Sequence, residues 1–419
     1  MAEKLTNEQQ AAVDSRERSL LVSAAAGSGK TKVLVERLFS YVEREGANLD
    51  DFLIITYTRA AASELRGKIA KALTERMERD PGNYHLRQQM LRVYRADIKT
   101  VDAFCTALLR ENCHLLGEDA RGHALRPDFR VLDENEAQVL RERVLARTLD
   151  DFYDCLTPGG TLLADTLGAG RDDSALEDLV LELHAKLQAQ PYEDKWLEAQ
   201  RAFWRAVPDK IEDTPYGKIL LNEVRRKARH CKNLLQRAAQ EMCANDALNQ
   251  KYAPAFLDAS YQLEALEGKT AEGWDAARGV TIAFPRLAAV KDSDGGEMKA
   301  RMKSLWDNCK ETVKGFAEIF SASSDEAVED LRTMAPAMLA LIDLTADFSR
   351  RYNEEKRRRN SADFSDQEHE AIRLLIGEDG APTELARIVS APSSRYQSAR
   401  FSPVSYCHTC AKPVSTQPS

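Results

Sequence analysis

The sequence lacks long apolar runs, because none of its 419 residues lie in a stretch approaching the ~20 residues that span a bilayer. Its N-terminus, "MAEKLTNEQQ", has no basic segment followed by an apolar one, so no secretory signal is expected. Eight scattered cysteines form no disulfide framework and fit a reducing compartment. The net charge is −8, so a polyanion site must be a local basic patch. These features predict a soluble cytoplasmic protein without membrane attachment.

Acidic residues are missing from the end of the chain. No Asp or Glu follows Glu384, although charged residues make up 30% of the sequence. Residues 388–419 are rich in Ser and Pro and have no periodicity, which predicts a tail that is disordered or foreign to the fold. The tail contains Cys407, His408 and Cys410, but a zinc site normally needs four ligands. An incidental cluster is therefore the favoured interpretation.

Three short apolar runs, beginning at Ser19, Asp51 and Ala96, are each followed by sequence of helical period. This alternation predicts parallel strands and helices in an α/β layer. Beyond the third run the strand signal disappears and charged amphipathic stretches take over. We therefore expect an α/β domain interrupted by a large all-helical insertion. The expected division is 1–114 for the first part of the α/β domain, 115–360 for the insertion, 361–387 for the return and 388–419 for the tail.

A phosphate-binding loop is predicted where the first apolar run meets a helix, in "SAAAGSGKT" (residues 23–31). Such a loop needs glycines that let backbone N–H groups face phosphate, a Lys for the β- and γ-phosphates, and a hydroxyl for Mg²⁺. Lys30 and Thr31 supply the last two, as catalytic residues and, for Thr31, as metal ligand. A structural glycine-rich turn is the alternative. The predicted nucleotide-binding residues of the loop are Ala24, Ala25, Ala26, Gly27, Ser28, Gly29, Lys30 and Thr31.

Polar residues flank this loop in the sequence. Upstream, the amide of Gln9 in "LTNEQQAAV" can offer a donor and an acceptor to an adenine edge. Downstream, Tyr57, Thr58 and Arg59 follow the second apolar run, at the strand end where α/β sheets bind ligands. The tyrosine is suited to stack on a base, and its neighbours to hold phosphates. Thr100 follows the third run in the same way. The alternatives are a solvated Gln, a core aromatic and helix caps.

These motifs, with "ITYTRAAASEL" and "TVDAFC" in this order and spacing, resemble the N-terminal motifs of UvrD-like superfamily 1 DNA helicases. "FRVLDENEAQVL" and "ADFSDQEHEAIRLL" resemble in particular the AddA subunit of AddAB helicase–nucleases. The resemblance covers residues 4 to about 387. It implies a RecA-like domain with a helical insertion, ATP and Mg²⁺ as cofactors, and 3′-to-5′ movement on single-stranded DNA. It further implies double-strand-break repair and recombination, DNA ends as substrate and, as partner, an AddB-like second subunit.

Carried over residue by residue, the resemblance implies that Gln9 reads adenine and that Lys30 and Thr31 hold phosphate and Mg²⁺. It also implies that Tyr57, Thr58 and Thr100 touch DNA. Three positions depart from the family pattern. Ala24 replaces the first glycine of the loop, Arg59 stands where many members have Asn, and Asp102 stands where many have His. A phosphate contact by Arg59 fits its charge, whereas no DNA contact is predicted for Asp102.

ATP hydrolysis in this class needs an Asp and a Glu at the end of another strand, where they organise Mg²⁺ and the attacking water. The sequence offers no convincing pair of this kind. Asp133 and Glu134 are the candidates, but Arg130 interrupts the preceding segment, and Asp133 with Glu136 makes a helix-start pattern. We therefore expect a helix start there. The simplest interpretation is the N-terminal piece of a helicase, which binds ATP without hydrolysing it at a helicase's rate.

Two functions of other classes stay open from the sequence. One is a module that binds nucleotide or DNA without motor activity, and the other is a small-molecule P-loop kinase, which needs no stacking aromatic near Tyr57. Two basic stretches, "RRKARHCK" from Arg225 and "EKRRR" from Glu355, are predicted to be solvated helix faces.

Overall fold

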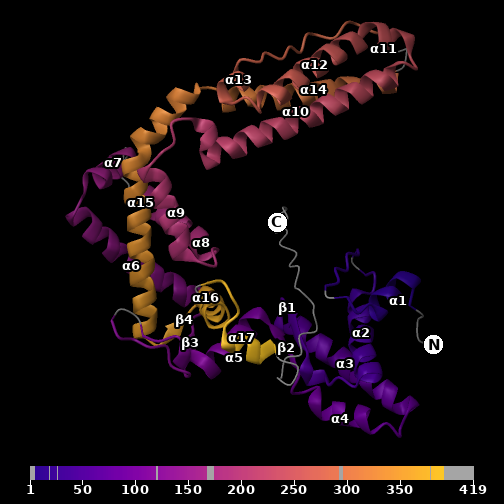
Figure 1. Cartoon of the computed structure of the whole chain (residues 1–419), viewed down its shortest axis with the longest axis vertical. Helices are drawn as coiled ribbons and strands as arrows, with labels where there is room; N and C mark the ends of the chain where they lie inside the picture. Colours follow the sequence, from indigo (N-terminus) through magenta and orange to yellow (C-terminus); the bar gives the residue numbers. More distant parts are fainter. Residues whose placement is uncertain are drawn as a thin grey trace. The chain divides into compact units, whose positions relative to one another are not determined.

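The computed structural model describes residues 5–17, 19–25, 27–118, 121–167, 174–291, 296–377 and 379–390. These residues are mostly helical and include two small parallel sheets of two strands each. The chain divides into two compact units (Figure 1). The first comprises Met1–Ala146 and Ser349–Ser419, and the second is Arg147–Phe348. The second unit falls within the predicted insertion.

The first unit contains both sheets, and its elements lie at both ends of the colour scale of Figure 1. In chain order they are α1 (Asn7–Asp14), α2 (Lys30–Glu45), β1 (Leu53–Thr56), α3 (Arg59–Arg79), α4 (Tyr84–Arg92), β2 (Asp97–Thr100), α5 (Val101–Asn112), β3 (Arg130–Val131), α6 (Glu134–Asp154, which continues into the second unit), β4 (Ser361–Ala362), α16 (Phe364–Leu375) and α17 (Glu384–Ser390). Short 3₁₀ turns occur at Leu49–Asp51 and Cys113–Leu115.

Strands β1 and β2 are parallel neighbours, with Leu53 opposite Asp97 and Thr56 opposite Thr100. Their inward residues join a core with α2 and α3, in which Phe39, Leu73 and neighbouring aliphatic side chains are fully buried. The second and third apolar runs therefore form the predicted strands. Their carboxyl ends lie side by side, so the residues that follow each strand share one edge of the sheet.

The first apolar run does not form the predicted strand. Residues 19–25 belong to no helix or strand, and Leu21 is 68% exposed. A strand is stable only when its backbone groups pair with a neighbour and its side chains are covered. The run pairs with neither β1 nor β2 and is not covered, so its β-propensity alone is insufficient. The predicted three-strand layer is thus a two-strand sheet.

The second sheet closes the insertion. β3 and β4 pair in parallel, so the chain leaves and re-enters the first unit at adjacent strands. After β4, α16 packs on α5, with Leu109, Phe129 and Leu374 in their shared core. The Thr106 hydroxyl on α5 donates to the side-chain carbonyl of Gln367 on α16. The return predicted from residue 361 is therefore packed against the helix that follows β2.

A buried ionic cluster fixes the point of return. Lys356, near the end of α15 (Ser324–Arg358), is only 1% exposed and donates to Asp363 at 2.9 Å and to Asp366 at 2.7 Å. Tyr352 also donates to Asp363, at 3.0 Å. Burial raises the pKa of Asp363, but the ammonium of Lys356 outweighs it and holds that pKa at about 2. The prediction that "EKRRR" is a solvated face is wrong for this lysine, because the carboxylates it meets follow α15.

Helices are the regular elements of the described part of the second unit, and residues 280–291 belong to no helix or strand. Helices α10, α12 and α14 form its main core, where the Phe256 and Trp306 rings stack 4.8 Å apart. Figure 1 shows these three helices side by side. "RRKARHCK" lies on α10, where Arg229 and Lys232 both pair with Glu267. The helices are α7 (Pro158–Leu167), α8 (Ser174–Gln188), α9 (Glu193–Arg205), α10 (Pro215–Met242), α11 (Asp246–Lys251), α12 (Ala253–Lys269), α13 (Trp274–Arg278) and α14 (Gly296–Ile319), with a 3₁₀ turn at Ile211–Asp213.

None of the helices in the described ranges combines the length and the apolar character needed to cross a membrane. Within the same ranges, His, Cys, Asp and Glu side chains form no group of three or more that could hold a metal ion. Nearly all of the predicted tail, with its Cys407-to-Cys410 cluster, lies outside the described residues.

The Lys356 cluster gives a stability prediction. Lys356→Met should lower the free energy of unfolding by about 3–5 kcal/mol, because it leaves the buried carboxylate of Asp363 and the half-buried one of Asp366 without their cation. Lys68→Met is the control, since Lys68 forms a solvent-exposed pair with Glu64 on α3 and should lose at most about 1 kcal/mol. Urea unfolding monitored by circular dichroism measures both. Equal losses in the two variants would contradict a structural role for the cluster.

Candidate functional site

The predicted phosphate loop adopts a geometry that only glycine accommodates easily. Gly27 and Gly29 have φ values of 78° and 82°, in the left-handed region. Gly29 is the N-cap of α2, so the helix begins at Lys30. The free N–H groups of the first turn of α2 therefore lie directly after the loop. This is the arrangement in which a helix N-terminus binds phosphate. Ala26 lies outside the described residues.

The charges of α2 also suit an anion. Its first turn contains no acidic residue and begins with Lys30, although a cation is unfavourable at a helix N-terminus. The Lys30 ammonium donates to the carbonyls of Ala24 and Ala25, at 2.5 Å and 2.8 Å. Thr31 is exposed in the same turn. A cation, a hydroxyl and free N–H groups thus gather within one turn, and this donor set fits the phosphates of Mg²⁺-ATP.

Gln9 lies against this loop and contacts Ser28, which is 19 residues further along the sequence. Its Nε2 donates to the Ser28 carbonyl at 3.0 Å, and its Oε1 accepts from the Thr6 N–H at 3.0 Å. The Thr6 hydroxyl in turn accepts from the Gln9 N–H, so the two residues form a capping box at the start of α1. An amide has two N–H donors and two acceptor lone pairs. One donor and one acceptor of Gln9 therefore remain for a ligand.

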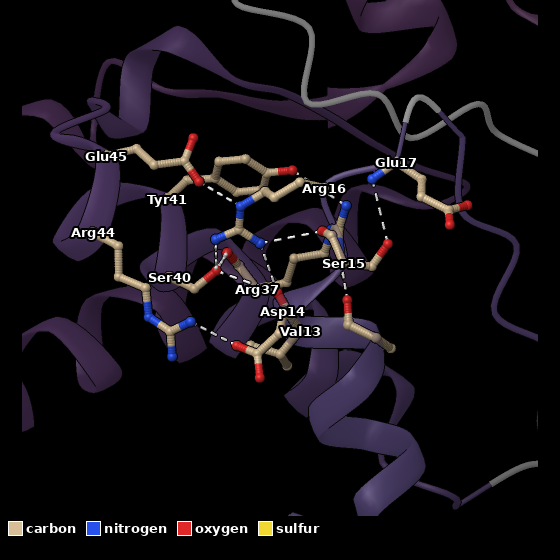
Figure 2. Close-up of polar contacts among 11 residues, drawn as sticks. Val13, Asp14, Ser15, Arg16, Glu17, Arg37, Ser40, Tyr41, Arg44 and Glu45 are labelled. Carbon is tan, nitrogen blue, oxygen red and sulfur yellow. Dashed lines mark hydrogen bonds and ion pairs between the residues drawn. The ribbon is translucent and has the colours of Figure 1, made fainter.

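Helix α1 is held on α2 by a group of arginines (Figure 2). Arg37 on α2, which is 4% exposed, donates to the carbonyls of Ala12 and Ser15 at the end of α1. These carbonyls lack partners inside α1, so the cation stabilises the negative end of that helix. Arg16 donates to the Ser40 hydroxyl at 2.9 Å and forms an ion pair with Glu45.

A second contact joins the same two helices. Arg44 pairs with Asp14 at 2.7 Å, and hydrogen bonds from Gln10 and Arg44 hold the pKa of Asp14 below its ordinary value. The guanidinium of Arg16 also lies 4.1 Å from the centre of the Tyr41 ring. These contacts fix α1 on the helix that starts at the phosphate loop, and thereby place Gln9.

Tyr57, Thr58 and Arg59 lie where β1 ends and α3 begins. Tyr57 is 74% exposed and directly follows the strand. Thr58 caps α3 by accepting from the Ala61 N–H at 3.0 Å, and Arg59 is exposed in the first turn of α3, which contains no acidic residue. The hydroxyl of Thr58 thus serves the helix, while the ring and the cation face solvent.

Thr100 has a different setting. It is 6% exposed, and its hydroxyl caps α5 by accepting from the Ala103 N–H at 3.2 Å. Asp102 follows in the first turn of α5 and lies near Glu368 of α16. The pKa of Glu368 is raised, mainly by burial and also by the negative charge of Asp102. Burial also raises the pKa of Cys105 to about 11. This end of α5 is therefore occupied by its own contacts, which count against a DNA contact by the Thr100 hydroxyl.

The helix start at Asp133 is confirmed. The Glu136 N–H donates to the Asp133 carboxylate at 2.9 Å, and α6 begins at Glu134. These carboxylates therefore serve the capping of α6. Sequence reasoning missed the contribution of Thr6, although the pattern of Thr followed three residues later by Gln signals a capping box. No local pattern marks Arg37, because its acceptors lie on another helix.

Comparison with known proteins agrees with this geometry. The UvrD/REP helicase N-terminal domain family matches residues 5–391. The chain belongs to this family. The AddA protein of Ruminiclostridium cellulolyticum, an ATP-dependent helicase/nuclease subunit, is 31% identical over 401 residues, which cover 92% of this chain and 31% of that protein. The corresponding AddA proteins of Acetivibrio thermocellus and Alkaliphilus oremlandii are 32% and 34% identical, covering 90% and 89% of this chain.

The resemblance to UvrD-like helicases, inferred from the motifs between Leu5 and Cys105, is thereby confirmed, and so is the resemblance to AddA, inferred from the motifs that begin at Phe129 and Ala362. The chain spans about 30% of the length of the curated relatives it matches. Membership of the UvrD/REP family implies a RecA-like fold for the first unit and ATP use in the family. The roles of individual residues in this UvrD/REP-family site stay predictions.

Two glycines of the loop allow a matched test of the Gln9 contact. Gly27→Ala and Gly29→Ala should each cost about 1 kcal/mol of stability, because both have positive φ. A Cβ at Gly29 would lie 3.2 Å from Gln9 Nε2, whereas one at Gly27 meets nothing within 4 Å. Only Gly29→Ala should therefore speed amide hydrogen exchange in α1. Equal exchange in both variants would show that Gln9 is not held by the loop.

Proposed function

We propose that this chain is the ATP-binding and DNA-contacting part of an AddA-type, ATP-dependent 3′-to-5′ DNA helicase subunit that acts on DNA ends in break repair. The contact of Gln9 with the phosphate loop is the observation that carries the proposal. A structural turn would not need an amide with an unused donor and acceptor beside it. A nucleotide would meet the loop with its phosphates and Gln9 with its adenine.

On binding ATP, the Lys30 ammonium would exchange its present acceptors, two backbone carbonyls, for phosphate oxygens. The Lys30 ammonium now donates to two neutral carbonyls, and phosphate oxygens would offer it charged acceptors, which form stronger hydrogen bonds. Thr31 would supply its hydroxyl to Mg²⁺, which would neutralise phosphate charge. The first-turn N–H groups of α2 would hold the remaining oxygens. Gln9 would distinguish adenine by pairing with its amino group and ring nitrogen.

A single strand of DNA would lie along the edge formed by the ends of β1 and β2. The exposed Tyr57 ring offers a surface on which a base can stack, and Arg59 offers charge to the backbone. Since α2 ends shortly before β1 begins, we infer that it runs back along the sheet and that its loop is at this same edge. Nucleotide and DNA would then be neighbours. A small-molecule kinase has no use for the exposed ring.

A binding-only module is the second candidate, and the use of Asp133 in a helix cap favours it. Asp133 and Glu134 follow β3, and in the described residues no Asp–Glu pair directly follows β1 or β2. Positioning of water and Mg²⁺ accounts for most of phosphoryl-transfer catalysis, so we expect ATP binding with little turnover. The relatives are named as subunits of a helicase/nuclease, which supports a partner subunit for this chain, and the free cysteines support a cytoplasmic location.

Nucleotide binding is tested at Lys30. Lys30→Ala should abolish measurable Mg²⁺-ATP binding in isothermal titration calorimetry, because it removes the charge that faces the phosphates. Lys68→Ala, on α3, should bind like the wild type. Similar affinities for wild type and Lys30→Ala would refute the loop as a nucleotide site.

DNA binding is tested at Tyr57. Tyr57→Ala should weaken binding of a 20-nucleotide oligothymidylate by about tenfold, since stacking contributes about 1–3 kcal/mol per base. Tyr261→Ala is the control, because this tyrosine is similarly exposed on α12 of the second unit. Fluorescence anisotropy measures both. If neither variant changes the affinity, the strand does not contact this edge through Tyr57.

A further inference from the structure

Helix α4 presents an unusual face to solvent. Tyr84, Leu91 and Tyr94 are 72%, 77% and 72% exposed, so their side chains contact little of the protein. At 100° per residue, Tyr84 and Leu91 point in nearly the same direction, and Tyr94 lies in the turn that directly follows α4. Large apolar side chains gathered on a solvent face mark interaction sites more often than single exposed ones do.

This face, which we call the α4 face, comprises Tyr84, Arg87, Gln88, Leu91, Tyr94 and Arg95, all of them exposed. Residues 81–96 contain three arginines and no Asp or Glu, in a protein of net charge −8. Arg92 pairs with Asp50, but Arg95 forms no ion pair with any residue that the structure describes. The α4 face is thus a local positive patch with two aromatic rings.

The face is built on a fixed backbone. Arg66 of α3 donates to the carbonyls of Val93, Tyr94, Ala96 and Ile98, at 3.0–3.3 Å. Leu86 and Val93 on the opposite side of this segment are buried in the core of the first unit. The protein therefore holds the segment rigidly and leaves its tyrosines outside. The four hydrogen bonds from Arg66 fix the backbone of this segment, which a flexible surface loop would not require.

The α4 face lies away from the proposed nucleotide and DNA edge. Tyr94 and Arg95 precede β2, whereas Tyr57 and Thr100 are at the carboxyl ends of the parallel strands. α3 leaves that edge and runs for 21 residues, about 30 Å, before α4 begins. Figure 1 shows α4 beside α3 at the far end of this helix. A ligand on this face would be distinct from one at Tyr57.

We propose that the α4 face is a second binding site for single-stranded DNA. The two tyrosine rings would stack on unpaired bases, and Arg87 and Arg95 would face the phosphates. Residues 81–96 carry arginines and no Asp or Glu, which favours a polyanion over a neutral apolar partner. This site goes beyond the contact proposed at Tyr57 and would hold a strand that has already left, or has not yet reached, that edge.

Photo-crosslinking of the full chain tests the proposal. The probe is a 20-nucleotide oligothymidylate carrying 5-bromodeoxyuridine, and tryptic peptides are mapped by mass spectrometry. We expect label on the peptide of residues 80–87, which contains Tyr84. The double variant Tyr84→Ala with Tyr94→Ala should reduce labelling of residues 80–95 by about tenfold or more. Label on the Tyr57 peptide should persist.

Four further measurements make the result decisive. Tyr57→Ala should remove label at its own peptide and leave the α4 face labelled, so failure of one site is distinguished from failure of the other. Tyr261→Ala should change neither peptide. The double variant should unfold at the wild-type temperature, since its side chains are exposed. Arg95→Gln should lower the salt dependence of labelling by about 0.7 in the logarithmic slope, the value for one phosphate contact on a single strand.

Two outcomes would overturn the proposal. One is label at Tyr57 with none on residues 80–95. The other is unchanged DNA labelling in the double variant together with lost binding of the second helicase–nuclease subunit, which would assign the α4 face to a protein partner.

Discussion

The first unit depends on closing a chain that leaves it after residue 146 and returns at residue 349. Bringing such distant segments together costs conformational entropy, which local propensity cannot offset. The β3–β4 pairing supplies the contact between the two segments. The Lys356 cluster then fixes the turn from α15 into α16, because its buried ammonium meets the carboxylates of Asp363 and Asp366. α16 then sits on α5 through Gln367, and α5 starts where β2 ends. Within the first unit, the returning segment and the sheet edge are thus joined by a short series of packed elements.

A second constraint acts at the phosphate loop. α1 is only eight residues long, too short to be stable alone in water. Its position is set by Arg37 of α2, which binds its terminal carbonyls, and by Arg16, which follows α1 and contacts both the Val13 carbonyl and Ser40 of α2. Gln9 reaches Ser28 only because of that anchoring. The candidate adenine contact therefore depends on arginines outside the nucleotide site, which hold Gln9 in a fixed position relative to the phosphate loop.

Much of the site could be predicted from the sequence because its signals are local. Glycines at positive φ, threonine caps before α3 and α5, and the Asp133 cap all follow from residues within a few positions of each other. The strand predicted at residues 19–25 failed because a strand needs neighbours that local sequence cannot supply. The burial of Lys356 was missed because "EKRRR" has the charge pattern of a solvated helix, whereas the chain turns back after α15 and places Asp363 against the lysine.

Helix α2 follows the phosphate loop, α3 follows β1 and α5 follows β2. The residues at the starts of these three helices differ, and the difference indicates which of them are suited to bind an anion. α2 and α3 both begin with a cation and have no acid in the first turn, an arrangement that weakens an isolated helix. Proteins keep such local conflicts mainly where function requires them. α5 begins instead with a buried, satisfied Thr100 and an acid at Asp102, as a structural helix would. Anion binding is therefore expected at the starts of α2 and α3, where Lys30 and Arg59 stand, and the start of α5 supports that edge by packing rather than by contact.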